Sequence, residues 1–145
     1  MDKTLKPIIE KVHAREILDS RGFPTVEVEI TASGHKSISA VPSGASTGEF
    51  EALELRDGDT KRFHGKGVLK AVDHVLNNFG PALIGKDASN QKEIDDLLIN
   101  IDGSSNKSTF GANASLGISM ACSVVSANFY NKSLYHYLNP NSNVI

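Results

Sequence analysis

The chain has 145 residues, with 15 lysines and arginines against 17 aspartates and glutamates, and a formal net charge of −2. This length suits one domain with a real core but is too short for a (β/α)8 barrel, which needs about 250 residues. The charge balance argues against a nucleic-acid-binding surface, and no stretch approaches the roughly 18 apolar residues of a membrane span. We expect no signal peptide, and the single cysteine, Cys122, supports neither an internal disulfide nor a zinc site.

The first third of the chain is predicted to form three strands. Val26, Val28 and Ile30 alternate with polar residues, and this period of two is typical of a strand with one buried face. The segments 12–18 and 36–41 are the expected neighbours on either side. Because the connections are short and parallel strands need long crossovers, we expect an antiparallel meander.

The rest of the chain is predicted to be helical. Apolar residues at helical spacing occupy three segments, 68–79, 94–101 and 118–129. We expect the first helix to end at the Gly80-Pro81 pair, because proline in a helix interior removes a hydrogen bond and crowds the preceding turn.

Capping residues mark the other helix ends. Asn90 and Glu93 form a capping box at the start of the second helix, and Gly103 follows its end. Ser133 is expected to cap a last short helix that runs through Leu138. Strands followed by helices indicate the α+β class.

The segment 42–49, Pro-Ser-Gly-Ala-Ser-Thr-Gly-Glu, is the most unusual in the chain. Gly44 to Gly48 spell G-x-S-x-G, a pattern that makes Ser46 a nucleophile when it stands on a strand–helix turn of a parallel sheet. The expected antiparallel sheet disfavours that hydrolase interpretation. A capping box between Ser46 and Glu49 would make the segment an ordinary turn. A hinged lid would instead use the glycines for movement and the hydroxyls to reach a cation or a phosphate.

Other candidate motifs are weaker. The segment 64–67, His-Gly-Lys-Gly, matches neither the Walker A nor the Rossmann pattern, so we interpret it as a turn that opens the next helix. The five histidines show no metal-ligand spacing. Arg15 and Glu27 stand on expected strands, where they are either surface charge or part of a surface that a partner recognises.

A series of segments carries a family resemblance. In chain order they are Ala14–Gly22, Pro24–Glu29, Val41–Gly48, Glu51–Asp59, Gly65–Val68, Asp102–Gly103, Asn106–Ser108 and Gly111–Ala114. Together they resemble the N-terminal domain of the enolase family, over residues 8–138. The departures are small, because Phe23 stands where the family usually has asparagine and Ser115 where it usually has an aliphatic residue.

The resemblance implies a fold and a reaction. The fold is a three-stranded antiparallel meander followed by a helical bundle, with residues 1–138 as the lid-bearing domain and 139–145 as the start of a linker. We expect a C-terminal barrel to follow and the 145-residue chain to be a truncated piece of the longer protein. The reaction is the reversible dehydration of 2-phosphoglycerate to phosphoenolpyruvate, by a glycolytic lyase that uses two Mg²⁺ ions. The barrel carries the acid, the base and the ligands of the first metal, so no catalytic residue and no turnover are expected from this chain alone.

The resemblance also implies roles for particular residues. Ser46 matches the serine that holds the second Mg²⁺ through its hydroxyl and its own carbonyl. The other residues implied for the lid and the substrate pocket are Ser43, Gly44, Ala45, Thr47 and Gly48. Arg15 and Glu27 match positions at the subunit interface of a homodimer or larger homo-oligomer.

A binding module is the alternative function. Members of this family are associated with host plasminogen and extracellular matrix, which would add the cell surface, reached without a signal peptide, to the expected cytoplasmic location. The lysines of this chain are dispersed, so no residue pattern indicates such a site.

Overall fold

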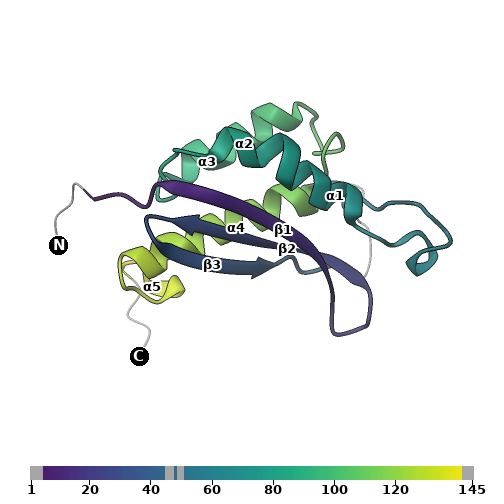
Figure 1. Cartoon of the computed structure of the whole chain (residues 1–145), viewed down its shortest axis with the longest axis horizontal. Helices are drawn as coiled ribbons and strands as arrows, with labels where there is room; N and C mark the ends of the chain where they lie inside the picture. Colours follow the sequence, from purple (N-terminus) through teal and green to yellow (C-terminus); the bar gives the residue numbers. More distant parts are fainter. Residues whose placement is uncertain (1–4, 45–47, 49–50, 142–145) are drawn as a thin grey trace.

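The computed structural model describes residues 5–44, 48 and 51–141. Three strands, β1 (Ile9–Leu18), β2 (Pro24–Ala32) and β3 (His35–Ala40), form an antiparallel sheet in the order β1-β2-β3 (Figure 1). This confirms the expected meander. The register pairs Arg15 with Glu27, and it pairs Val28 with both Ala14 and Ser39.

Strand β2 is the centre of the sheet and shows the predicted alternation. Val26, Val28 and Ile30 are fully buried against the helices, whereas Glu27 and Glu29 lie on the opposite, partly exposed face. On β3 the buried face carries serines instead. The Ser37 hydroxyl donates a 2.8 Å hydrogen bond to the carbonyl of Ala121, which ties the sheet to the helix above it.

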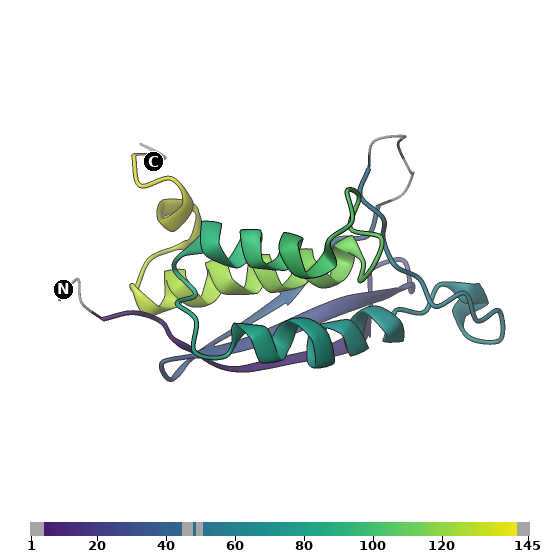
Figure 2. The same ribbon diagram turned by 90° about the horizontal axis from the view of Figure 1, so that it is seen from above.

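The helices follow in chain order. They are a 3₁₀ turn η1 (Phe63–Gly65), α1 (Leu69–His74), a π-helical turn η2 (Val75–Phe79), α2 (Gly80–Leu83), α3 (Gln91–Asp102), α4 (Ala112–Phe129) and α5 (Leu134–Leu138). Helix α4 packs on β2 and β3, while α1, η2 and α2 pack on β1. Helix α3 runs beside α4, and α5 lies at the end of the sheet away from the segment 51–67 (Figure 2). One face of the sheet is therefore covered.

The predicted helix end at Gly80-Pro81 is wrong. The helix continues from α1 through η2 into α2, and the Gly80 N–H donates to the carbonyl of Val75, five residues back. This wider turn places Pro81, which has no N–H to donate, in the first turn of α2, where proline is tolerated. Gly80 serves close packing, since a Cβ there would lie 2.9 Å from the Val75 carbonyl oxygen and 3.6 Å from the Val12 Cβ.

The other helix ends match the sequence in part. The Asn90 side chain accepts from the Glu93 N–H, and Gly103 ends α3 with a φ of 69°, so Asn90 and Gly103 are confirmed as the residues that bound this helix. The predicted capping box is met only in part, because the Asn90 N–H donates to the Asp87 carbonyl and the Glu93 carboxylate accepts from the Asn90 side-chain amide instead. Ser133 precedes α5, but its hydroxyl lies 3.2 Å from His136 Nδ1 and caps no backbone N–H. None of the described helices is long and apolar enough to cross a membrane.

Candidate functional site

The predicted lid follows β3 at one end of the sheet. Ala45, Ser46 and Thr47 lie outside the described residues, as does Glu49 of the alternative capping box, so the roles assigned to them stay predictions. Ser43, Gly44 and Gly48 are described, and so is the returning segment from residue 51. The described part of the site is therefore the stem of this loop.

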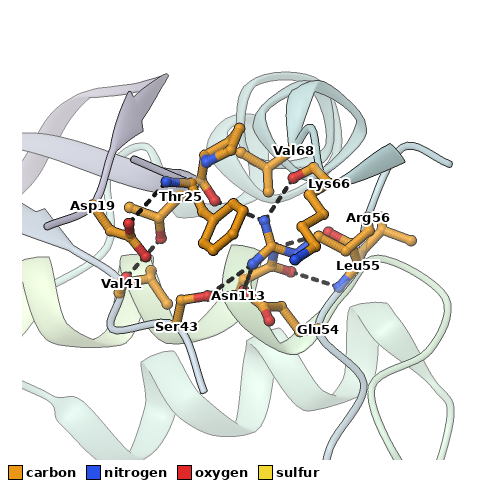
Figure 3. A network of polar contacts seen from close by, with 12 residues as sticks. Asp19, Thr25, Val41, Ser43, Glu54, Leu55, Arg56, Lys66, Val68 and Asn113 are labelled. Atoms are coloured by element: carbon orange, nitrogen blue, oxygen red, sulfur yellow. Dashed lines mark hydrogen bonds and ion pairs between the residues drawn. The ribbon is translucent and has the colours of Figure 1, made fainter. Parts of the chain in front are cut away.

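Arg56 joins the two sides of the stem (Figure 3). Its guanidinium donates to the Ser43 hydroxyl at 2.8 Å and to the Glu54 carboxylate at 2.7 Å. It also donates to the backbone carbonyls of Pro24 and Lys66, both at 2.7 Å. The Ser43 hydroxyl in turn donates to Glu54 at 3.1 Å. We call Arg56, Ser43 and Glu54 the Arg56 clamp.

The β1–β2 turn supports the outgoing side of the stem. The Thr25 hydroxyl donates to the Val41 carbonyl at 2.6 Å, and the Arg21 guanidinium donates to the Ser43 carbonyl at 3.3 Å. Asp19 shapes this turn by accepting from the backbone N–H groups of Phe23 and Arg21. Those bonds, that of Phe23 above all, hold the pKa of Asp19 below its ordinary value. The carboxylate therefore stays charged and keeps the turn in place.

The start of α4 supports the returning side. The Asn113 side chain pairs with the backbone of Leu55, accepting from its N–H at 3.1 Å and donating to its carbonyl at 3.0 Å. The Leu53 carbonyl accepts a further hydrogen bond from the N–H of Ala112. The approach is so close that a Cβ on Gly111, whose φ is 95°, would lie 2.5 Å from the Leu55 Cβ. Only glycine fits at this point.

The loop before α4 adds a further brace. The Asp102 carboxylate accepts from the N–H groups of Ser104 and Phe110 and from the Ser104 hydroxyl. Burial acts to raise the pKa of Asp102, but these hydrogen bonds outweigh it and the pKa is lowered. The loop so held presents the Asn106 carbonyl to the N–H of Leu53 at 2.9 Å.

An open groove of about 640 Å³ lies beside the stem. The residues that line it include Pro42, Gly44, Gly48, Glu51, Leu53, Glu54, Arg56, Asn113 and Leu116. Both glycines implied as hinges therefore border a space that a small polar molecule or a neighbouring domain could fill. Both terminal nitrogens of Arg56 already donate to protein oxygens, so they are not free to bind an anion in this structure.

Metal binding was predicted at Ser46 through oxygen donors. Among the described residues, no group of three His, Cys, Asp or Glu side chains could hold a metal ion. Ser43 is committed to the Arg56 clamp, because its hydroxyl both accepts from Arg56 and donates to Glu54. The other hydroxyls of the segment 42–49 belong to Ser46 and Thr47, which lie outside the described residues. Hydroxyl oxygens are donors of the kind that suits Mg²⁺, so the metal-binding role of Ser46 stays a prediction.

Arg15 and Glu27 lie on the open face of the sheet. Arg15 Nε is 3.2 Å from Glu27 Oε1, and Arg15 Nη2 donates to Glu29 Oε2 at 2.8 Å. Lys36 pairs with Glu29 from the other side at 3.0 Å, and its hydrogen bond is the main cause that lowers the pKa of Glu29. The structure therefore places both predicted interface residues in a charged ladder, away from the groove.

The described fold argues against a nucleophile in the G-x-S-x-G motif and against a phosphate loop in the His-Gly-Lys-Gly motif. All three strands that the structure describes are antiparallel, so the parallel sheet that a G-x-S-x-G nucleophile requires is missing from the described fold. The His-Gly-Lys-Gly turn precedes α1, and the first N–H groups of that helix, on Leu69 and Lys70, donate to the carboxylate of Asp57. Those donors are taken by protein, which supports the structural interpretation of the turn.

Sequence reasoning missed the residues that hold the stem. Arg56, Glu54 and Asn113 belong to quoted motifs but had no predicted role. Asn113 gave one usable signal, since a large polar side chain stands at the start of a helix of small residues. Arg56 gave none, because its acceptors lie up to 32 residues away along the chain.

Comparison with known proteins agrees with this architecture. The family model described as "Enolase, N-terminal domain" matches residues 9–138. The enolase of Methanococcoides burtonii is 59% identical over 133 residues, which is 92% of this chain and 31% of that protein. Enolase 1 of Entamoeba histolytica is 58% identical over 130 residues, or 90% of this chain and 30% of that protein. The chain spans about a third of the length of the curated relatives it matches, and it belongs to the enolase N-terminal domain family.

Proposed function

We propose that this domain works as the lid-bearing part of an enolase, a cytoplasmic glycolytic lyase that interconverts 2-phosphoglycerate and phosphoenolpyruvate. The observation that carries the proposal is the identity of 58–59% to two proteins named enolase over nearly the whole chain. Those relatives are about three times longer. The proton-transferring groups and the ligands of the first metal belong to a C-terminal barrel, and the 145-residue chain alone is inactive.

The surface around the groove supports docking of that barrel. Three aliphatic residues beside α4 each have more than two fifths of their surface exposed to solvent, namely Leu53, Ile99 and Leu116. All three line the hollows on this side of the domain. Exposed aliphatic side chains gathered beside a groove mark a surface that another part of the protein covers.

Ser46 is the functional residue of this domain in the proposal. Its hydroxyl and carbonyl would hold the second Mg²⁺, an ion that takes oxygen ligands and keeps several waters. When bound, Mg²⁺ supplies positive charge that balances the carboxylate and phosphate oxygens of the substrate. Gly44 and Gly48 act as hinges, and Ala45 and Thr47 line the closed pocket. Closure of the lid would exclude water and bring the Ser46 hydroxyl to where the ion would bind.

Arg15 and Glu27 serve subunit assembly in the proposal. Both belong to the charged ladder on the uncovered face of the sheet, and the Arg15 side chain is 42% exposed. A second subunit that presents opposite charges to this ladder would extend it across a homodimer interface. Such pairs set the register of an interface more than they add affinity.

The test is Ser46→Ala in the full-length enzyme, with product followed by the ultraviolet absorbance of phosphoenolpyruvate. Removal of a single group that stabilises charge in the transition state typically lowers kcat about 10²-fold, and we expect a loss of this size when the Ser46 hydroxyl is removed. The Mg²⁺ concentration for half-maximal activity should rise as well. Ser133→Ala, at the far end of the domain, is the matched control. An unchanged Mg²⁺ dependence in Ser46→Ala would refute the role of Ser46. Product formed by the 145-residue chain alone would refute the need for the barrel.

A further inference from the structure

We infer that helix α5 docks onto the C-terminal barrel through the exposed apolar side chains of Leu134, Tyr135 and Leu138, which we call the α5 patch. The inference rests on the proposed function only in that a barrel follows this domain. It concerns neither the lid nor the metal. It names a surface that the barrel covers beside the point where the two domains join.

The α5 patch is unusually exposed for its composition. Leu134 is 40%, Tyr135 52% and Leu138 62% exposed, although α5 has only five residues. Leu138 lies four residues after Leu134 and three after Tyr135, so the three side chains adjoin on one side of the helix. Large apolar side chains gathered on one exposed face mark a surface that another body covers.

Tyr137 contacts the domain from a different side of α5. Its ring stacks on that of Tyr130, with the ring centroids 6.2 Å apart and an angle of 16° between the planes. Its hydroxyl donates a 3.4 Å hydrogen bond to the Ser89 carbonyl. One side of α5 therefore already packs on its own domain, and the α5 patch remains outside that contact.

Helix α5 is too short to be stable through its own hydrogen bonds. Isolated helices of fewer than about 12 residues are marginal in water, and most helical stability in proteins comes from packing. Ser133 provides no side-chain cap for the first turn. Packing on a second side would therefore stabilise α5 beyond what the contact of Tyr137 supplies.

Covalent attachment favours the barrel as the body that covers the α5 patch. The enolase N-terminal domain model ends at residue 138, which is also the last residue of α5, and the relatives are about three times as long as this chain. A domain tethered directly after α5 has an effective concentration in the mM range at this patch. A separate protein or a second copy would have to reach that concentration in solution to compete.

The position of α5 allows the barrel to cover the α5 patch together with the hollow between α3 and α4. Figure 2 shows α5 and α3 on one side of the domain and α1 and α2 on the other. Ile99 of α3 and Leu116 of α4, both exposed, line that hollow of about 370 Å³. A body docked on the α3 side can therefore contact both surfaces.

The first experiment compares hydroxyl-radical labelling of side chains, read by mass spectrometry, in the 145-residue chain and in the full-length enzyme. Leu69 is the matched control, because it is 48% exposed and lies on α1, on the other side of the domain. A side chain in the core of an interface loses most of its exposure, so Tyr135 should be labelled at least about threefold more slowly in the full-length enzyme, and Leu69 within about twofold of its rate in the chain alone.

The second experiment removes part of the α5 patch and measures hydrogen exchange. Leu138→Ala deletes most of the apolar side chain but keeps a good helix former. The amides of Tyr137 and Asn139 report on α5, because they donate to carbonyls one turn earlier. In the full-length enzyme Leu138→Ala should speed their exchange about tenfold, since a buried leucine is lost, and in the 145-residue chain by less than about twofold. Leu69→Ala should leave both amides unchanged.

The outcomes separate the inference from the proposed function. Equal labelling of Tyr135 in both proteins refutes the docking of α5, and the proposed function stands if the full-length enzyme forms phosphoenolpyruvate. Absence of that activity refutes the proposed function, whereas the labelling still decides whether the following domain covers α5. Protection of Tyr135 that appears in the 145-residue chain as its concentration rises identifies a second copy as the occupant and overturns the inference. Protection that disappears when the full-length enzyme is diluted to monomers overturns it as well.

Discussion

Gly117 sets how closely α4 approaches the sheet, and Gly117→Ala should destabilise the domain although alanine is the better helix former. A Cβ at this position would lie 2.7 Å from Val28 Cγ2 and 3.1 Å from Val41 Cγ2. Carbon atoms pack best at about 3.5–4.0 Å, so the methyl group is about 1 Å too close to Val28. Val28 is fully buried and stiff at χ1, which leaves it little room to turn away.

The magnitude follows from two opposing effects. Alanine stabilises a helix interior by about 1 kcal/mol relative to glycine. Overpacking of a tight core costs about 1–3 kcal/mol, and two clashing valines place this site near the upper end. The net loss should be about 2 kcal/mol, or a factor of about 30 in the folding equilibrium. With a urea slope of about 2 kcal/mol/M, the midpoint should fall by about 1 M.

The assay is urea unfolding of Gly117→Ala, Val28→Ala and the double variant. Val28→Ala removes the nearer of the two methyl groups that the new side chain would meet and leaves that of Val41. The double variant should therefore lose at least about 1 kcal/mol less stability than the two single variants together. Additive losses would show that the two positions do not clash. A Gly117→Ala variant as stable as the parent would refute the reasoning outright.

Two further predictions concern contacts near the site. The Arg62 guanidinium is the main cause that lowers the pKa of Glu16 in the folded state, so the stability from this pair is present above the ordinary glutamate pKa and is lost as pH falls through the lowered folded value. Glu16→Gln should therefore weaken the fold more at pH 7 than at pH 3, as measured by urea midpoints. An equal loss at both pH values would contradict this, and Glu10→Gln is the control. Asn113→Asp replaces the donor to the Leu55 carbonyl by an acceptor and should cost about 1–3 kcal/mol, which hydrogen exchange should register as faster opening at the Leu55 amide.

Much of the fold could be predicted because its signals are local. The alternation of Val26, Val28 and Ile30 predicts both the strand and its buried face, since neighbouring side chains on a strand point to opposite sides. Asn90 and Gly103 bound α3 through bonds within a few residues of themselves. The short connections predict the meander for the same reason.

Pro81 shows where local reasoning fails. Proline usually ends a helix, but a π-helical turn leads this helix on into α2, and all three of its parts pack against β1. The packing of the helix against β1 decides the outcome, and a pattern within one segment does not contain that information.

For the site, the sequence by itself determined the family, the loop after β3 and the serine expected to bind metal. It also supplied the glycines that border the groove. The tertiary structure alone decided how the stem of that loop is held. The acceptors of Arg56 lie on Pro24 in β2, on Lys66 between η1 and α1, and on Ser43 and Glu54 in the two sides of the stem. Hydrogen bonds between residues 10 to 32 positions apart depend on how the elements pack, and no spacing in the sequence encodes them.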